Sequence, residues 1–197
     1  MYEKSKQFFN SFNSIFDTEN PLREIAVSKY PDNTAFTEFI ISQIESIIKE
    51  QPIDQKEVYA QKEYFRIDAI GYTSSLEKLP ENFTKKSRLK EHLWDLEIAV
   101  EHENDSTDWL DEVIKLAHVC CPLRVVIGYV PCNTRQDDMM LLDYVAQALK
   151  KLKCRQNLLH GEFLVILGNS NTKGKQENYF NYKPYVLDTK NSRFIEL

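Results

Sequence analysis

Apolar residues recur along the chain at two different periods, and these periods predict where its helices and strands lie. Spacings of three and four residues, typical of the buried face of a helix, predict helices at residues 3–16, 35–50, 107–120 and 135–153. Alternating or continuous apolar residues, typical of strands, predict strands at residues 58–61, 64–72, 94–104, 123–130, 162–168, 185–188 and 193–196. This order predicts a mixed α/β fold with a central β-sheet flanked by helices.

The connections between these segments predict part of the topology. The strand at 94–104, the helix at 107–120 and the strand at 123–130 form a crossover unit, so the two strands are expected to be parallel. The nearly continuous apolar run at 123–130 predicts a strand that is covered on both faces. The last two strands are expected to form a hairpin, and residues 73–92 a long polar, basic loop or short helix.

The chain shows no internal repeat and no linker rich enough to divide it, which predicts a single domain over residues 1–197. Within it we expect an N-terminal helical extension at 1–34, with an irregular connection between Pro21 and Pro31, and an α/β core at 35–197. A content of 42% hydrophobic and 12% aromatic residues, with only five Gly and seven Pro, indicates a folded rather than a disordered chain.

The charge pattern and the cysteines of the chain indicate in which cellular compartment the protein is expected. Charged residues such as Glu45 and Arg124 interrupt the longest apolar runs, so no membrane span is predicted. The N-terminus lacks the features of a secretory signal, and the four cysteines have no C-x-x-C spacing. We therefore expect a reduced, cytoplasmic protein in which the cysteines are small apolar fillers. The net charge of −5 counts against bulk attraction to nucleic acid, although Lys85–Lys90 is a local basic cluster.

The predicted strand at 94–104 carries the acidic pattern that most needs an explanation. Strand alternation places Glu101 and Glu103 on one face and His102 on the other, where a role in the core is expected for the histidine. Two carboxylates roughly 6–7 Å apart along a strand repel each other unless a cation or a partner compensates. A solvent-exposed strand face is the simplest alternative, but the apolar run 98–100 favours a buried strand whose end emerges at a site.

A third acid, Asp68, lies in the preceding predicted strand, where Asp is depleted. An edge position or a cross-strand ion pair is the alternative to a ligand role. Asp68, Glu101 and Glu103 on successive strands match the needs of a divalent-cation site for phosphodiester hydrolysis. Mg²⁺ prefers oxygen ligands, and such an ion both activates water and neutralises phosphate charge.

These residues resemble the PD-(D/E)XK nuclease superfamily, which has the restriction-endonuclease-like fold. The segment Arg66–Ala69 resembles the strand that carries the Asp of the family, and Ile98–Glu103 resembles the next strand, which carries Glu-x-Lys. The helix at 107–120 and the strand at 123–130 follow in the order that the family shows. The resemblance covers residues 35–130 and implies a restriction-endonuclease-like core.

The chain departs from the family motif in two places. Ile67 stands where Pro is usual before the Asp, and Glu103 stands where Lys is usual. Some family members carry Glu at that position, and the lysine migrates in others, so Lys115 on the following helix is a candidate substitute. Many members add an acid on the first core helix, a position that Glu45 can fill.

The resemblance implies a Mg²⁺- or Mn²⁺-dependent endonuclease that hydrolyses DNA in restriction, defence or repair. Asp68 and Glu101 would be the metal ligands, Glu103 a ligand or general base, and Lys85–Lys90 the phosphate-contacting segment. Expected partners are double-stranded DNA, a second copy of the chain, and a methyltransferase or other subunit of a defence system. No association with a membrane is expected. The alternatives are a non-catalytic module of this fold that binds a protein partner or nucleic acid, and an unrelated α/β protein whose acids are surface residues.

Overall fold

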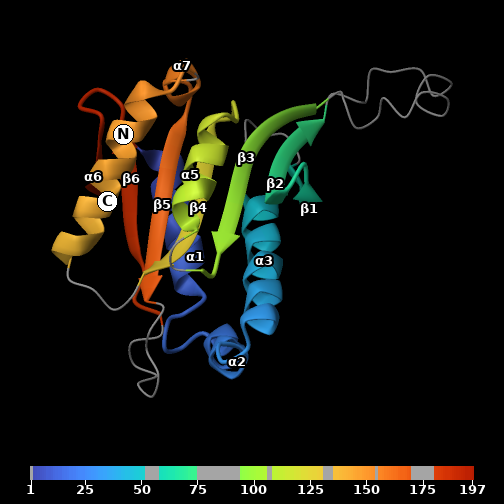
Figure 1. Ribbon diagram of the computed structural model, residues 1–197. Coiled ribbons are helices and arrows are strands. Elements are labelled where there is room, and N and C mark those ends of the chain that lie inside the picture. Colours follow the sequence, from blue (N-terminus) through green and yellow to red (C-terminus); the bar gives the residue numbers. More distant parts are fainter. Residues whose placement is uncertain are drawn as a thin grey trace, which may run out of the picture.

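Seven strands of the described chain form one mixed β-sheet, and their spatial order follows their order in the sequence (Figure 1). The structure, a computed structural model, describes residues 2–51, 58–74, 94–105, 108–130, 135–153, 155–169 and 180–197. The strands are β1 (Val58–Tyr64), β2 (Ile67–Ser74), β3 (Trp94–Glu103), β4 (Leu123–Val130), β5 (Glu162–Asn169), β6 (Lys183–Asp188) and β7 (Arg193–Glu196). The predicted mixed α/β fold with a central sheet is therefore confirmed.

The sheet is parallel in its centre and antiparallel toward both edges. Strands β3, β4 and β5 run parallel, whereas β1 and β2 join them by antiparallel pairing on one side and β6 and β7 on the other. The predicted crossover between β3 and β4 and the predicted terminal hairpin are thus confirmed. All eight residues of β4 are buried, as expected of a strand that is covered on both faces.

Helices cover the two faces of the sheet and bury a separate apolar core on each (Figure 1). One core includes residues of α1 (Glu3–Ser14), α2 (Pro21–Lys29) and α3 (Asn33–Glu50), and the other includes residues of α5 (Trp109–Ala117), α6 (Arg135–Lys151) and α7 (Arg155–Leu158). Strand β4 divides its side chains between them, since Val125 belongs to the first core and Val126 to the second. Among the described residues, none of the helices combines the length and the apolar composition needed to cross a membrane.

Side-chain caps determine where two helices of the first face begin. The Asp32 carboxylate accepts a hydrogen bond from a backbone N–H in the first turn of α3 at 3.1 Å. Asn20 caps α2 in the same way by accepting from the Leu22 N–H at 3.0 Å. Pro21 takes the first position of α2, where no backbone donor is needed. The predicted irregular connection between Pro21 and Pro31 is therefore wrong over the length of α2.

A tight turn divides the predicted strand 64–72. Tyr64 ends β1 and pairs with Ile67, the first residue of β2, so that Phe65 and Arg66 form a two-residue turn. The two segments predicted as separate extended stretches are therefore one antiparallel hairpin.

Of the cysteines expected to be apolar fillers, Cys121 is buried but Cys120 is exposed, so the expectation is wrong for Cys120. Cys132, Cys154 and the predicted phosphate-contacting segment Lys85–Lys90 lie outside the described residues.

Close packing fixes α5 against β4 and thereby positions the side chains that α5 carries. A Cβ atom at Gly128 would lie 2.7 Å from the Cβ atom of Trp109, so only glycine lets the first residue of α5 lie against the strand. Beyond the other end of α5, the fully buried Arg124 side chain donates hydrogen bonds to the carbonyl oxygens of Val119 and Asn157, both at 2.6 Å. Both ends of the helix are therefore held in place relative to β4.

Candidate functional site

Two of the predicted site residues lie where the pairing of β2 with β3 ends. Ala69 and Val100 are the last pair of these antiparallel strands, and Asp68 and Glu101 are the next residue on each strand. The Asp68 carboxylate bonds to the backbone N–H of His102, the neighbour of Glu101, and its charge acts on Glu101. Asp68 is partly buried, and Glu101 is only 2% exposed. The structure therefore brings these two acids together on the sheet.

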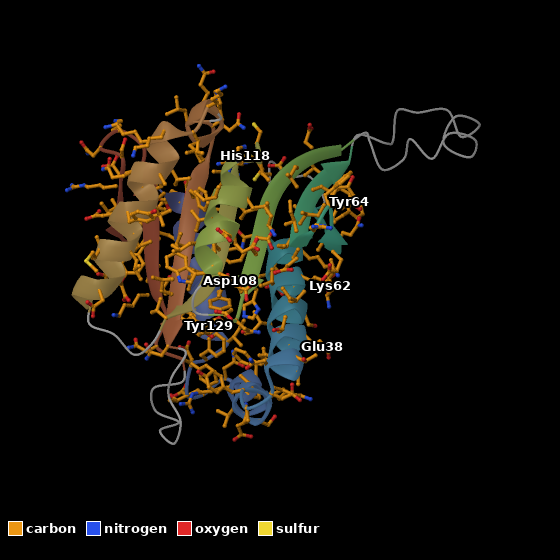
Figure 2. All side chains as sticks on the ribbon, in the orientation of Figure 1. Glu38, Lys62, Tyr64, Asp108, His118 and Tyr129 are labelled. Carbon is orange, nitrogen blue, oxygen red and sulfur yellow. The ribbon has the colours of Figure 1, made fainter. Side chains whose placement is uncertain are left out.

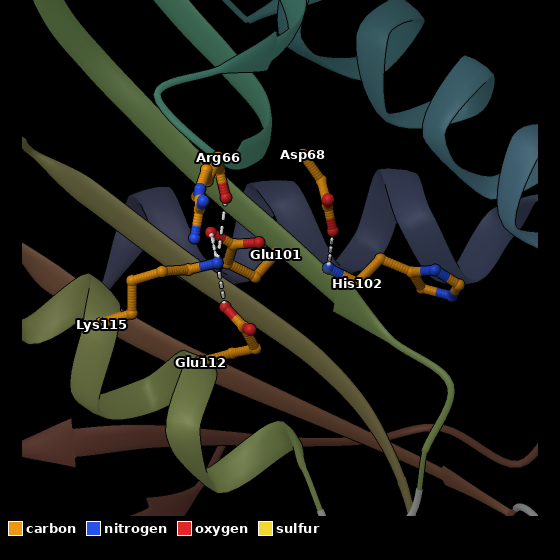
Figure 3. Close-up of polar contacts among 6 residues, drawn as sticks. All are labelled: Arg66, Asp68, Glu101, His102, Glu112 and Lys115. Carbon is orange, nitrogen blue, oxygen red and sulfur yellow. Dashed lines mark hydrogen bonds and ion pairs between the residues drawn. The ribbon is translucent and has the colours of Figure 1, made fainter.

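Lys115 of α5 places an ammonium group at the same position (Figure 3). Its Nζ atom lies 2.8 Å from Glu101 Oε1 and donates a hydrogen bond to the Arg66 carbonyl oxygen at 3.0 Å. It also forms an ion pair with Glu112, three residues earlier on the helix. Oxygen atoms from β3, from α5 and from the β1–β2 turn thus surround the ammonium group. We call Asp68, Glu101, Glu112 and Lys115 together the acidic cluster.

Asp68 is held by the backbone of β3. Its Oδ2 atom accepts a hydrogen bond from the His102 N–H at 2.8 Å (Figure 3). Burial, the largest influence, raises the pKa of Asp68, and Glu63 and Glu112 raise it further, whereas the His102 bond and Lys115 lower it. The net result is a raised pKa, because burial and like charges disfavour the ionised carboxylate.

The acidic cluster holds more negative charge than the lysine balances. Burial, and to a smaller extent Asp68 and Glu112, raise the pKa of Glu101 to about 8 against the opposing effect of Lys115. Burial alone would lower the pKa of Lys115, but its hydrogen bonds to Glu101 and Glu112 raise it, so the ammonium stays charged. Two carboxylates pair with this ammonium and Asp68 adds a third acidic group nearby, so a further cation, either a proton or a metal ion, would relieve the imbalance.

The backbone is strained directly before Asp68. Glu63, Phe65 and Arg66 have φ angles of +53°, +49° and +63°, in the left-handed region that side chains rarely adopt. Phe65 and Arg66 are the two central residues of the turn, and positive φ at both matches a type I′ turn, for which Asn-Gly is the preferred sequence. Each such residue costs on the order of 1–2 kcal/mol, and strain of this kind is concentrated at functional sites.

The other two predicted site residues have partners outside the acidic cluster. Glu103 Oε1 accepts a hydrogen bond from the Asp105 N–H at 2.7 Å, which holds its side chain in the turn after β3. Glu45 lies on α3, which packs on the face of the sheet opposite to α5. It pairs at 3.2 Å with Lys62, a residue of β1 that Figure 2 labels. Within the described ranges, no group of three or more His, Cys, Asp or Glu side chains is arranged to hold a metal ion.

His102 points to the face opposite to Glu101, as alternation predicts. It is 5% exposed, and its Nε2 atom lies 2.9 Å from the Tyr129 hydroxyl, which in turn lies 3.1 Å from the Tyr182 hydroxyl. Burial lowers the pKa of His102 to about 3, so the ring is neutral. The prediction that this histidine belongs to the core is confirmed.

Sequence reasoning did not identify Glu112 or the Arg66 carbonyl group as members of the site. A signal for Glu112 is present, because it precedes Lys115 by three residues on a predicted helix, a spacing that puts both side chains on one face. The Arg66 carbonyl has no such signal, since the Phe65–Arg66 turn lacks the glycine or asparagine that marks a hairpin.

Comparisons of the chain with protein-family models, with curated protein sequences and with solved structures gave no significant match.

Proposed function

We propose that this protein is a divalent-metal-dependent endonuclease with a restriction-endonuclease-like core, and that it hydrolyses phosphodiester bonds of DNA. One observation carries the proposal: Asp68 and Glu101 lie next to the last paired residues of adjacent strands, and the Lys115 ammonium lies 2.8 Å from Glu101. Two carboxylates and a lysine are the side chains of the motif that the sequence resembles. Here the lysine comes from the helix that follows the second acid.

The order of elements also supports the proposal. From α3 to β4 the described elements run helix, three strands, helix and strand. The first acid lies on β2 and the second on β3, and α5 then leads to β4, which is parallel to β3. This is the order that the resemblance implies for a nuclease core.

The donor atoms of the cluster fit a hard divalent cation. Mg²⁺ prefers oxygen ligands and keeps several waters, so that one or two carboxylates and the substrate phosphate are enough to hold it. Asp68 and Glu101 would be those carboxylates. Burial, and to a smaller extent Asp68 and Glu112, raise the pKa of Glu101 to about 8, and a bound cation would favour its ionised form. The bound ion would supply an activated water molecule and neutralise charge on the scissile phosphate.

The remaining residues of the cluster would act on the phosphate and on one another. The Lys115 ammonium, held by Glu112 and the Arg66 carbonyl, would stabilise the negative charge that develops on the phosphate oxygens. It is charged and oriented before substrate arrives, so little reorganisation is needed. Glu103 would act as ligand or general base only after giving up its hydrogen bond to the Asp105 N–H, and the proposed mechanism does not require Glu45.

The test combines a Mn²⁺ titration by isothermal calorimetry with cleavage of supercoiled plasmid DNA. Asp68→Asn and Glu101→Gln are expected to lose Mn²⁺ binding and cleavage while keeping the circular dichroism spectrum of the wild type. Glu97→Gln is the matched control, because this carboxylate lies on the same strand but accepts a hydrogen bond from Thr73 instead. Plasmid cleavage at the wild-type rate by both site variants would refute the proposal.

A non-catalytic module that binds a protein partner or nucleic acid is the second candidate. The net charge of −5 favours the protein-binding form of this candidate, because an acidic protein attracts the DNA backbone poorly. This candidate predicts that the wild type neither binds Mn²⁺ at the acidic cluster nor cleaves plasmid DNA, so the same experiment distinguishes the two functions.

A further inference from the structure

We propose that the Phe65–Arg66 turn is the substrate-contacting tip of the site, and that Phe65 stacks on an unpaired base beside the scissile phosphate. The inference rests on the proposed nuclease function and deepens it. It defines the substrate class as DNA that offers an unstacked base next to the cleaved bond, either as a single strand or as an unpaired nucleotide in a duplex.

The exposure of Phe65 is not explained by folding. The residue is 79% exposed, more than any other large apolar residue in the described part of the chain. Burying a Phe side chain is worth about 1.5–3 kcal/mol, and an exposed one gains none of this. Its only described ring contact is edge-on to Tyr64, with centroids 4.6 Å apart and planes at 89°, so the ring is supported without being enclosed.

The backbone conformation of the turn is one that Phe and Arg disfavour. Phe65 and Arg66 both have positive φ, and Asn and Gly adopt this conformation with far less strain. The turn therefore carries a bulky aromatic ring and a guanidinium group at the expense of stability, which is the pattern expected where a strained segment serves binding.

The turn is joined directly to the acidic cluster (Figure 3). The Arg66 carbonyl oxygen accepts a hydrogen bond from Lys115 Nζ at 3.0 Å, and Lys115 in turn lies 2.8 Å from Glu101. Asp68 follows Arg66 by two residues, at the start of β2. A phosphate held at Asp68 and Glu101 therefore has its neighbouring nucleotides within reach of the turn.

The two side chains suit an unpaired nucleotide better than a duplex groove. An aromatic ring stacks on any base whose face is free, and a guanidinium group pairs with phosphate oxygens. In a perfect duplex both faces of every internal base are already stacked, so Phe65 has no face to contact. The tip thus selects the structure of the DNA and not its sequence.

The test uses three fluorescein-labelled DNAs of one sequence: a single strand, a perfect duplex, and a duplex with one unpaired base. Binding is measured by fluorescence anisotropy in EDTA and cleavage in Mn²⁺. Phe65→Ala is expected to bind the single strand and the duplex with the unpaired base about 5- to 150-fold more weakly, the range expected for loss of one stacked base, while the perfect duplex changes little. Tyr144→Ala, which removes a 72% exposed aromatic residue of α6, is the matched control and is expected to leave all three affinities unchanged.

A second variant separates the contact from the fold. Phe65→Asn places a residue that tolerates positive φ in the turn, so its melting temperature is expected to equal or exceed that of the wild type while its affinity falls as in Phe65→Ala. Equal affinities of the wild type and both Phe65 variants for all three DNAs would overturn the inference and leave the nuclease function standing. If the wild type cleaves none of the DNAs in Mn²⁺, the nuclease function fails, and the anisotropy measurements still decide whether the tip contacts an unpaired base.

Discussion

Replacement of Glu101 by glutamine separates the electrostatic cost of the acidic cluster from its function. Glutamine has nearly the same shape, and its carbonyl oxygen can still accept a hydrogen bond from Lys115 Nζ, but it carries no charge and does not titrate. We expect Glu101→Gln to match the stability of the wild type at acidic pH, to exceed it at alkaline pH, and to lose metal binding.

The magnitude follows from the pKa of the buried carboxyl group. The folded protein raises the pKa of Glu101 from the ordinary 4.5 to about 8. Its contribution to stability is therefore fully present below pH 4.5 and is lost as the pH rises through 8. At 1.36 kcal/mol per pKa unit, the complete loss is at most about 5 kcal/mol. Because Lys115 and the surrounding groups relax when the acid ionises, we expect the measured loss to be about 2–4 kcal/mol.

The assay is urea unfolding followed by circular dichroism in EDTA, at about pH 5 and about pH 8.5. Subtracting the free energy of unfolding of the variant from that of the wild type at each pH cancels the contributions of all other titrating groups. At the higher pH, Mn²⁺ at about 100 times its dissociation constant is expected to stabilise the wild type by about 2.7 kcal/mol and the variant not at all. Glu97→Gln, on the same strand, is expected to follow the wild type under all conditions.

Two results would contradict this reasoning. If the wild type and Glu101→Gln lose stability in parallel between the two pH values, the buried carboxyl group does not carry the expected electrostatic cost. If Mn²⁺ stabilises the variant as much as the wild type, Glu101 is not a metal ligand.

Three further expectations concern neighbouring contacts. Lys115→Met is expected to abolish plasmid cleavage and to destabilise the protein in urea by about 2–4 kcal/mol at alkaline pH, because the buried Glu101 loses its ammonium partner; unchanged stability would contradict this. Gly128→Ala places a Cβ atom 2.7 Å from Trp109, so α5 must shift. The variant is expected to lose about 1–3 kcal/mol of stability and to cleave DNA more slowly. Cleavage at the wild-type rate would show that the position of α5 does not matter for cleavage. Burial lowers the pKa of His102 from 6.5 to about 3, so between these pH values the unfolded chain binds a proton that the folded protein does not. The free energy of unfolding of the wild type is therefore expected to fall by about 2 kcal/mol between pH 6.5 and 5. His102→Gln should remove this part of the fall, and an unchanged pH dependence of its stability would contradict the low pKa of His102.

The central strands can be predicted from the sequence because burial on both faces leaves a clear apolar pattern. Strand β4 spans the predicted residues 123–130, and β3 ends within one residue of the predicted boundary. Asp68 and Glu101 are visible for the same reason, since they are charged residues at the ends of apolar segments. That they lie close together depends on the β2–β3 register, which the order of the elements does not specify.

Features set by local backbone forces are harder to predict. Helix α2 has only one buried residue, Ala26, so its apolar pattern is weak, and its start depends on the Asn20 cap and on Pro21. The Phe65–Arg66 turn adopts a conformation that its residues disfavour, so propensity points away from it. Side chains that complete the cluster from a helix, such as Glu112, become apparent only when Lys115 is already assigned to the site.

The strand order of the sheet repeats the order of the chain, and this has a consequence for folding. Each described strand after β1 pairs with the described strand that precedes it in the chain. Pairing between strands that are close in sequence favours rapid folding. All four residues of the acidic cluster lie in the segment from Asp68 to Lys115, which is synthesised before β5–β7. The residues of the cluster therefore lie in one continuous part of the chain, with the β1–β2 turn directly before it and the C-terminal strands after it.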